Sequence, residues 1–266
     1  MLKDVALGQY YPVDSVLHRL DPRTKLAGTL IYIVALFFCN KWQSYALATI
    51  FLAVSISLSR VPLSYMLRGL KGIIFILLIS VSFNLFLTDG KVLWQWKFIK
   101  ITAEGLLLAG FMALRLVYLV VGSTIMTLTT TPNALTQGME RGLGFLKVFR
   151  VPVHEIAMMM SIALRFIPIL MEETDKIMKA QMARGADFES GNMIRKAHAM
   201  VPLLVPLFVS AFRRATDLAM AMEARCYHGG EGRTQMKPLR YKRADRIAYA
   251  IQLFFLVAVV CCRVLF

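Results

Sequence analysis

Two arginines stand out among the side chains that could do chemistry, because their sequence settings match. Arg184 lies within Ala-Arg-Gly and Arg225 within Ala-Arg-Cys, about 41 residues apart, each at the end of an expected helix. A guanidinium is always charged and forms paired hydrogen bonds with a carboxylate. Losing one partner of a partly buried arginine–carboxylate contact strands the other charge, at a cost of roughly 3–5 kcal/mol. Both arginines are therefore candidates for ion pairs with carboxylates.

Motifs of common enzymes and metal sites are missing from the sequence. It contains no GxxxxGK[ST], HExxH, GxSxG or DxDxDG pattern. Its histidines and cysteines lack the spacing of metal ligands or of a disulfide framework, so we expect no metal site. Glu172 and Glu173 could form an acid/base pair, but adjacent helical residues point in different directions. A solvated charged face is the better interpretation of these two glutamates.

Arg115 is the single charge in the apolar run Gly105–Thr129. A charge in such a run is a functional candidate by default. The alternative, which we favour, is that Arg115 faces a helix bundle or reaches toward the membrane surface.

The composition indicates the kind of chain that positions these residues. Of 266 residues, 58% are hydrophobic and 18% charged, and the mean hydropathy is +0.60. Soluble domains are about 45–50% apolar and about 25% charged. A net charge of +15 would fit a nucleic-acid-binding protein, but lysine and arginine also gather on the cytoplasmic face of membrane proteins. We therefore expect a membrane protein and no nucleic-acid partner.

Five apolar runs are candidate membrane helices, of which the first two are shorter than the roughly 20 residues that span a bilayer. The runs are Leu26–Cys39, Ser44–Ser59, Gly72–Thr88, Gly105–Thr129 and Ile247–Cys262. A basic loop, 60–71, precedes the third run, and the loop 89–103 carries Trp94 and Trp96, which suit a membrane interface. The segment 130–245 has 17 Lys or Arg against 11 Asp or Glu, which places it and the N-terminus in the cytoplasm.

The segment 130–245 has the periodicity of long amphipathic helices, with apolar residues every three or four positions. The upstream stripe is Ile156, Met160, Ala163, Ile167, Leu170 and Ile177. The downstream stripe is Ile194, Ala197, Val201, Leu204, Phe208, Phe212, Ala215, Ala219 and Met222. Pro202 and Pro206 should kink the second helix. Methionines are concentrated here, which suits either an adaptable partner surface or plain core filling.

The two arginine motifs strongly resemble the paired Ala-Arg-Gly motifs of the transmembrane T component (EcfT) of energy-coupling factor transporters. Further segments that look like this family are HRLDPRTKL, TLTTTPNAL, ALRFIPIL and AMEARCYHGGEGRTQ, so the resemblance covers most of the chain. One departure is Cys226, where the family has glycine. Glycine there could close the helix in the left-handed conformation, which cysteine tolerates poorly. We expect this helix to end differently, or Gly229-Gly230 to take over the break.

The resemblance implies a transmembrane scaffold that joins two cytoplasmic ABC-type ATPases to a small membrane S component in vitamin or metal-ion uptake. The ATPases would bind ATP, and this chain would carry no cofactor and no catalytic residue, in agreement with the missing P-loop. By similarity, the residues that contact the ATPases would be Ala183, Arg184, Gly185, Ala224, Arg225 and Cys226. The S component would contact apolar faces that include Met160, Ala163, Ile167, Leu204, Phe208 and Phe212.

We therefore predict an all-α, polytopic protein of the cell membrane, with about five transmembrane helices and long amphipathic cytoplasmic coupling helices. The expected parts are a cytoplasmic N-terminal segment (1–25), transmembrane helices 1–4 (26–129), a cytoplasmic coupling-helix domain (130–244) and a C-terminal transmembrane helix (245–266).

Two other functions remain as alternatives. A membrane enzyme would use Arg115, Arg165 and nearby carboxylates, but it needs a convergent polar cluster that the sequence does not show. A channel or secondary carrier is disfavoured, since we find neither paired intramembrane charges nor an inverted repeat.

Overall fold

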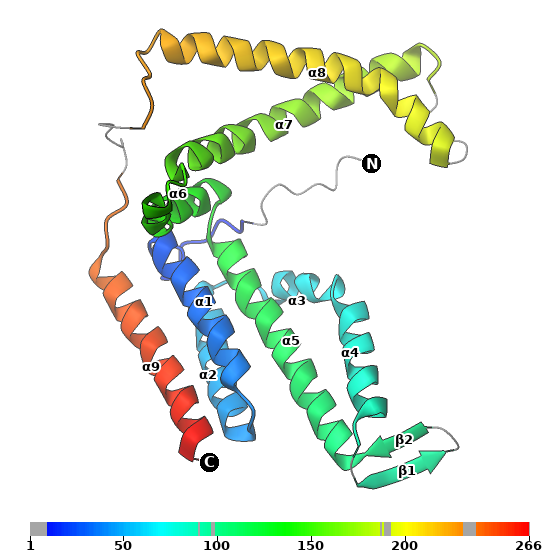
Figure 1. The fold of residues 1–266 in the computed structure, drawn as a ribbon, viewed down its shortest axis with the longest axis vertical. Coiled ribbons are helices and arrows are strands. Elements are labelled where there is room, and N and C mark those ends of the chain that lie inside the picture. Colours follow the sequence, from blue (N-terminus) through cyan, green and yellow to red (C-terminus); the bar gives the residue numbers. More distant parts are fainter. Residues whose placement is uncertain are drawn as a thin grey trace. The chain divides into compact units, whose positions relative to one another are not determined.

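The computed structural model describes residues 10–89, 91–96, 99–186, 188, 193–230 and 238–265. The chain divides into two compact units, which are coloured along the sequence in Figure 1. The bundle unit comprises the described residues of 8–139 and 239–266, and the long-helix unit comprises those of 140–238.

The bundle unit is built from the five apolar runs, and every one of them is helical. Its helices are α1 (Pro22–Phe38), α2 (Trp42–Ser59), α3 (Leu63–Lys71), α4 (Ile74–Leu87), α5 (Ala103–Thr129) and α9 (Arg243–Leu265), and α6 (Pro132–Gly142) crosses the boundary between the units. α1 and α2 both pack against α9, while α5 packs against α1, α3 and α4. The predicted all-α membrane fold is confirmed, with one short hairpin added.

Length and apolar composition qualify four of the described helices as membrane spans: α2, α5, α7 (Val153–Ala183) and α9. The pair α3 and α4 would form a fifth span, bent by 65° at the break between them. α1, with 17 residues, lies at the short end of the range of about 17–25 residues that crosses a bilayer. The basic stretch 60–71, which was expected to be a loop, thus contains the helix α3. The apolar part of α7 is what qualifies that helix as a candidate membrane span.

The connection between α4 and α5 is an antiparallel hairpin of β1 (Val92–Trp96) and β2 (Ile99–Thr102). The sequence-based interpretation treated this stretch only as a loop. The Thr102 hydroxyl accepts a hydrogen bond from the Gly105 N–H at 3.1 Å and donates to the Thr88 carbonyl at 2.8 Å. Thr102 therefore caps α5 and joins it to the end of α4. The side chains of Trp94 and Trp96 lie outside the described part of the chain.

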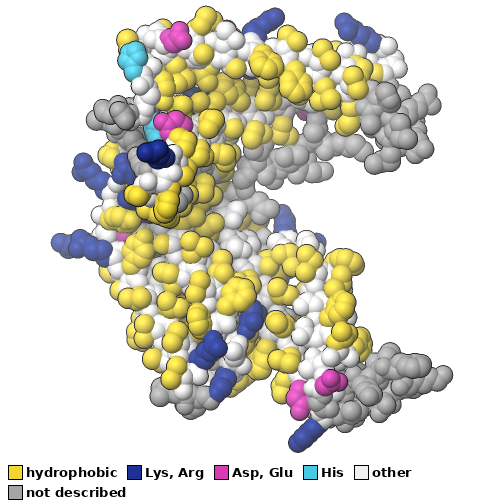
Figure 2. Space-filling view, in the orientation of Figure 1, with side chains coloured by type: hydrophobic (Ala, Val, Ile, Leu, Met, Phe, Trp, Pro, Cys, Tyr) yellow, Lys and Arg dark blue, Asp and Glu magenta, His cyan; other side chains and the backbone are white. Residues whose placement is uncertain are grey.

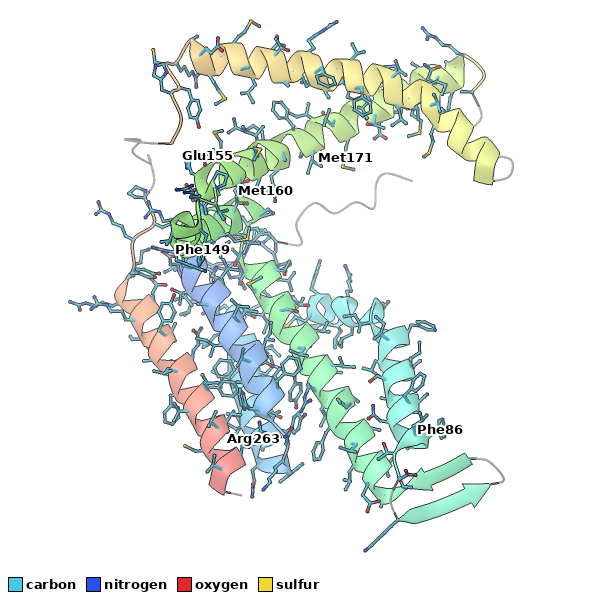
Figure 3. All side chains as sticks on the ribbon, viewed as in Figure 1. Phe86, Phe149, Glu155, Met160, Met171 and Arg263 are labelled. Carbon is cyan, nitrogen blue, oxygen red and sulfur yellow. The ribbon has the colours of Figure 1, made fainter. Side chains whose placement is uncertain are left out.

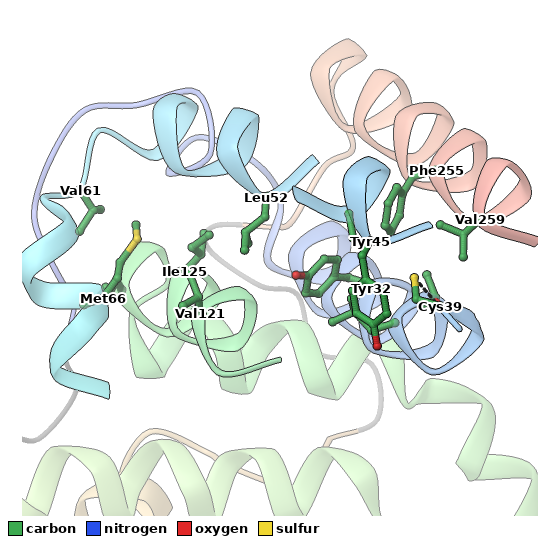
Figure 4. Close-up of a cluster of buried hydrophobic side chains, with 14 residues drawn as sticks. Tyr32, Cys39, Tyr45, Leu52, Val61, Met66, Val121, Ile125, Phe255 and Val259 are labelled. Carbon is green, nitrogen blue, oxygen red and sulfur yellow. Dashed lines mark hydrogen bonds between the residues drawn. The ribbon is translucent and has the colours of Figure 1, made fainter. Parts of the chain in front are cut away.

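The core of the bundle unit lies between α1, α2, α5 and α9 (Figure 4). Aromatic rings of three helices stack there: the Phe51 ring lies 4.3 Å from that of Phe255 and 5.8 Å from that of Tyr32, between ring centroids. Small buried residues, including Ala35 and Ala48, allow the backbones to approach closely. Close packing of this kind holds membrane helices together. It takes the place of the hydrophobic effect, which does not drive helix association in lipid.

A buried carboxylate joins the first and last helices of the bundle unit. The Asp245 side chain, 1% exposed, accepts a hydrogen bond from the Asp21 N–H at 2.8 Å and another from the Lys242 N–H at 2.7 Å. The second bond reaches back to the residue that precedes α9, as in a capping box. Asp245 therefore starts α9 and fixes it beside the start of α1.

The long-helix unit consists of the end of α6, a short 3-10 helix (Gly144–Phe149) and two helices of 31 residues each, α7 and α8 (Met193–Glu223). α7 and α8 pack against each other. α8 bends in its first half, where Pro202 and Pro206 remove backbone donors (Figure 1). The predicted long helices and the predicted kink are both present.

Candidate functional site

The first arginine closes α7 in a Schellman motif. Arg184 is the C-cap residue, and Gly185 follows it with a φ of +90°. The Gly185 N–H donates to the Met182 carbonyl at 2.9 Å, and the Ala186 N–H donates to the Gln181 carbonyl at 3.0 Å. These two bonds satisfy carbonyls that a helix end otherwise leaves unpaired. The motif leaves the Arg184 side chain exposed at the tip of the helix.

The second arginine has the same backbone setting. The Cys226 N–H donates to the Glu223 carbonyl at 2.8 Å, and the Tyr227 N–H donates to the Met222 carbonyl at 3.1 Å. Cys226 takes the left-handed position with a φ of +54°. Arg225 therefore matches Arg184 in position and is likewise exposed.

The expectation that the cysteine changes the helix end is wrong. Cys226 itself adopts the conformation that Gly185 adopts, and Gly229, although its φ is +99°, does not replace it. Ala183 is the last residue of α7, and Ala224 follows α8 but still donates to the Met220 carbonyl at 2.9 Å. The six motif residues thus form two helix ends of one geometry.

The two long helices are cross-linked through Glu173, in the polar last third of α7. Its carboxylate accepts hydrogen bonds from the Ser210 hydroxyl and from Arg214 of α8, at 2.8 Å from Nη2 and 3.2 Å from Nε. Ser210 and Arg214 are four residues apart and share one helix face. The prediction of a merely solvated glutamate pair is wrong for Glu173.

The segment after Arg225 returns to the start of α7. The Tyr227 hydroxyl donates to Met158 Sδ at 3.1 Å, and a Cβ added at Gly230 would overlap the His154 imidazole. His154 Nδ1 lies 2.7 Å from Glu140 Oε1. The second arginine end is therefore held against α7. Sequence reasoning missed these contacts, because none of them has a local signal.

The predicted apolar stripes are largely exposed on the long-helix unit. On α8, Leu204 is 48% exposed, Phe208 60% and Phe212 70%. On α7, Met160 is 44% exposed, Ala163 is exposed and Ile167 is half-buried. Figure 2 shows hydrophobic side chains along these helices, and Figure 3 labels Met160 and Met171 on α7. Large exposed apolar patches mark interaction surfaces or membrane contacts.

Arg115 points into the bundle unit, as the favoured alternative predicted. Its Nη2 donates to the Cys39 carbonyl at 2.7 Å and to Asn40 Oδ1 at 3.2 Å. Among the described residues Arg115 has no ion pair with a carboxylate, and Arg165 is exposed on the other unit. The described residues also contain no group of three His, Cys, Asp or Glu side chains that could hold a metal ion.

Comparison with known proteins defines the class as a membrane component of a transport system. A family model described as a cobalt transport protein, CbiQ, matches residues 14–236. Proteins named energy-coupling factor transporter transmembrane protein EcfT are 55% identical over 93% of this chain in Clostridium kluyveri and 50% identical over 97% in Bacillus subtilis; these matches cover 93% and 100% of the relatives. The chain belongs to the EcfT family and is the T component of an energy-coupling factor transporter.

Proposed function

We propose that this chain couples two ATPase subunits to a substrate-binding S component and so drives uptake of a vitamin or another micronutrient. The observation that carries the proposal is the pair of exposed arginines, Arg184 and Arg225, on helix ends of one backbone geometry. In this proposal residues 130–244 and the N-terminus lie in the cytoplasm, and the chain itself binds no ATP and no cofactor.

Each arginine supplies a docking group for one ATPase. Arg184 and Arg225 are both exposed and have no ion pair with another described residue, which suits pairing with partner carboxylates. The left-handed residue after each arginine turns the chain away from the helix axis, so that the tip stays accessible. Two matching tips suit two partners of similar structure.

The S component takes the exposed apolar stripes of α7 and α8. Phe208 and Phe212 offer large side chains that are mostly exposed, and Met160 adds a flexible one. In this proposal the Glu173–Arg214 cross-link fixes how the two stripes meet. A change at the arginine tips then alters the surface on which the S component rests.

The test is the double substitution Arg184→Ala and Arg225→Ala in the full transporter. We expect loss of ATPase co-purification and loss of substrate uptake, with unchanged membrane insertion. The matched control is Lys176→Ala with Arg213→Ala, which removes one exposed cation from each of α7 and α8. Normal uptake by the arginine double variant refutes the proposal, as does equal loss in the control.

The membrane-enzyme alternative finds no support in the contacts of its central residue. Arg115 donates to a backbone carbonyl and a side-chain amide, and both partners are structural. Uptake that requires the ATPases and stops without them would exclude a chain that acts alone.

A further inference from the structure

Three cations lie around the turn that joins α1 to α2, at one end of the bundle unit. Lys41 lies in the turn itself, just before α2. Arg115 of α5 donates to the carbonyl of Cys39 at 2.7 Å. The guanidinium carbon of Arg263, in the last turn of α9, lies 5.4 Å from the ring centroid of Phe38. Figure 3 labels Arg263 at this end of α9.

The positive charge of this cluster is not balanced by the described protein groups. The ion pairs recorded for the described residues all involve other cations. Asp21 and Asp245 lie at the opposite ends of α1 and α9, and Glu104 lies 11 residues before Arg115 on α5. Figure 2 shows basic side chains, without acidic ones among them, toward the C-terminal end of α9. Among the described residues no ion pair balances the cluster, which makes it suited to an anionic ligand.

Arg115 keeps one nitrogen available for such an anion. Nη2 is used by Cys39 and Asn40 and Nε is buried, whereas Nη1 contacts only Met112 Sδ, at 4.0 Å. Carbonyls at the end of α1 offset part of the charge. Lys41 and Arg263 are exposed, and neither has an ion pair among the described groups.

The surroundings of the cluster are those of a lipid surface. Trp42, next to Lys41, is 76% exposed, and Phe37 is 57% exposed. Apolar side chains on the flanking helices also face outward, among them Val34 on α1 and Phe254 on α9. Aromatic residues beside cations at helix ends mark the level of lipid headgroups. A soluble anion would make no favourable contact with these apolar side chains, whereas the acyl chains of a phospholipid would cover them.

We propose that Lys41, Arg115 and Arg263 bind the phosphate headgroup of an anionic phospholipid, whose acyl chains lie along Phe37 and the neighbouring apolar faces. With the N-terminus in the cytoplasm, this lipid belongs to the outer leaflet. The positive-inside rule makes uncompensated cations on that side unusual, and the bound phosphate supplies the missing charge. Each cation near an anionic lipid strengthens binding about fivefold. The site is separate from the arginine tips, and the coupling function does not require it.

The test compares lipid retention by the purified transporter complex in native mass spectrometry. The complex is loaded with phosphatidylglycerol or with phosphatidylcholine of the same acyl chains. We expect selective retention of phosphatidylglycerol, and a loss of at least about tenfold in its apparent affinity in the variant Lys41→Gln with Arg263→Gln. The matched control, Lys71→Gln with Lys91→Gln, removes two exposed cations elsewhere on the same unit and should retain the lipid.

Three results would overturn the proposal. The first is equal retention of both lipids by the wild type, and the second is equal loss of phosphatidylglycerol in variant and control. The third is displacement of phosphatidylglycerol by inorganic phosphate at low concentration, which would show a site for a soluble anion. Thermal unfolding of each variant in detergent confirms that the substitutions leave the fold intact.

Discussion

Gly185→Ala tests whether the conformation after each arginine matters for docking. Gly185 has a φ of +90°, and a Cβ there would meet no atom within 4 Å. The cost of alanine is therefore entirely backbone strain, about 1–2 kcal/mol for an L-residue in left-handed conformation. Such strain lowers the population of the closed helix end about 5- to 30-fold against frayed alternatives. If the ATPase binds only the closed form, its affinity falls by up to the same factor.

Two assays separate the strain from its functional effect. Hydrogen exchange should show faster exchange of the Gly185 and Ala186 amides, whose bonds close the motif. Binding of the ATPase pair to the chain in nanodiscs should weaken in parallel. Cys226→Ala is the matched control, because Cys226 already has a side chain at a φ of +54° and alanine adds no strain. Unchanged exchange at Gly185 would refute the strain argument, and faster exchange with unchanged binding would refute its role in docking.

Two further substitutions test contacts within a unit, the first in the bundle unit and the second in the long-helix unit. Asp245→Ala leaves the buried N–H of Asp21 without an acceptor and removes the acceptor of the part-buried Lys242 N–H, so we expect a loss of about 1–3 kcal/mol in the free energy of unfolding. A melting temperature equal to that of the wild type would contradict this. Gly230→Ala forces a methyl group into the His154 ring, and this overpacking costs about 1–3 kcal/mol of folding free energy. Adding His154→Ala should restore the stability and the ATPase binding that Gly230→Ala reduces. Lack of rescue would show that this contact is not the cause.

Most of the fold was predictable, because membrane helices carry their signal locally. The five apolar runs became helices of the bundle, since a backbone in lipid must satisfy its own hydrogen bonds. The short helix Leu63–Lys71 was missed because its charges resemble a loop. The hairpin was missed as well, although Ile99–Thr102 alternates apolar and polar residues in the manner of a strand.

The arginine positions were predictable from motif and spacing, but the contacts that fix them were not. The conformation of Cys226 depends on two backbone bonds that offset its strain, and no property of cysteine indicates them. The bond between Glu173 and Arg214 joins helices that are separate in sequence. Exposed charges on amphipathic helices are usually solvated, so only the packing of α7 on α8 identifies this pair.

The cross-link between Glu173 and Arg214 is a pivot between α7 and α8 that lies equally far along each helix from its arginine tip. Glu173 precedes Arg184 by 11 residues, and Arg214 precedes Arg225 by 11 residues. Both tips therefore lie about 16 Å from the pivot along their helices. The helix segments between the pivot and the two arginines contain no proline, because all prolines of α7 and α8 lie before the pivot: Pro168, Pro202 and Pro206. A rotation of about 10° at the pivot moves each tip by about 3 Å, and two ATPases that close together would pull on matched arms.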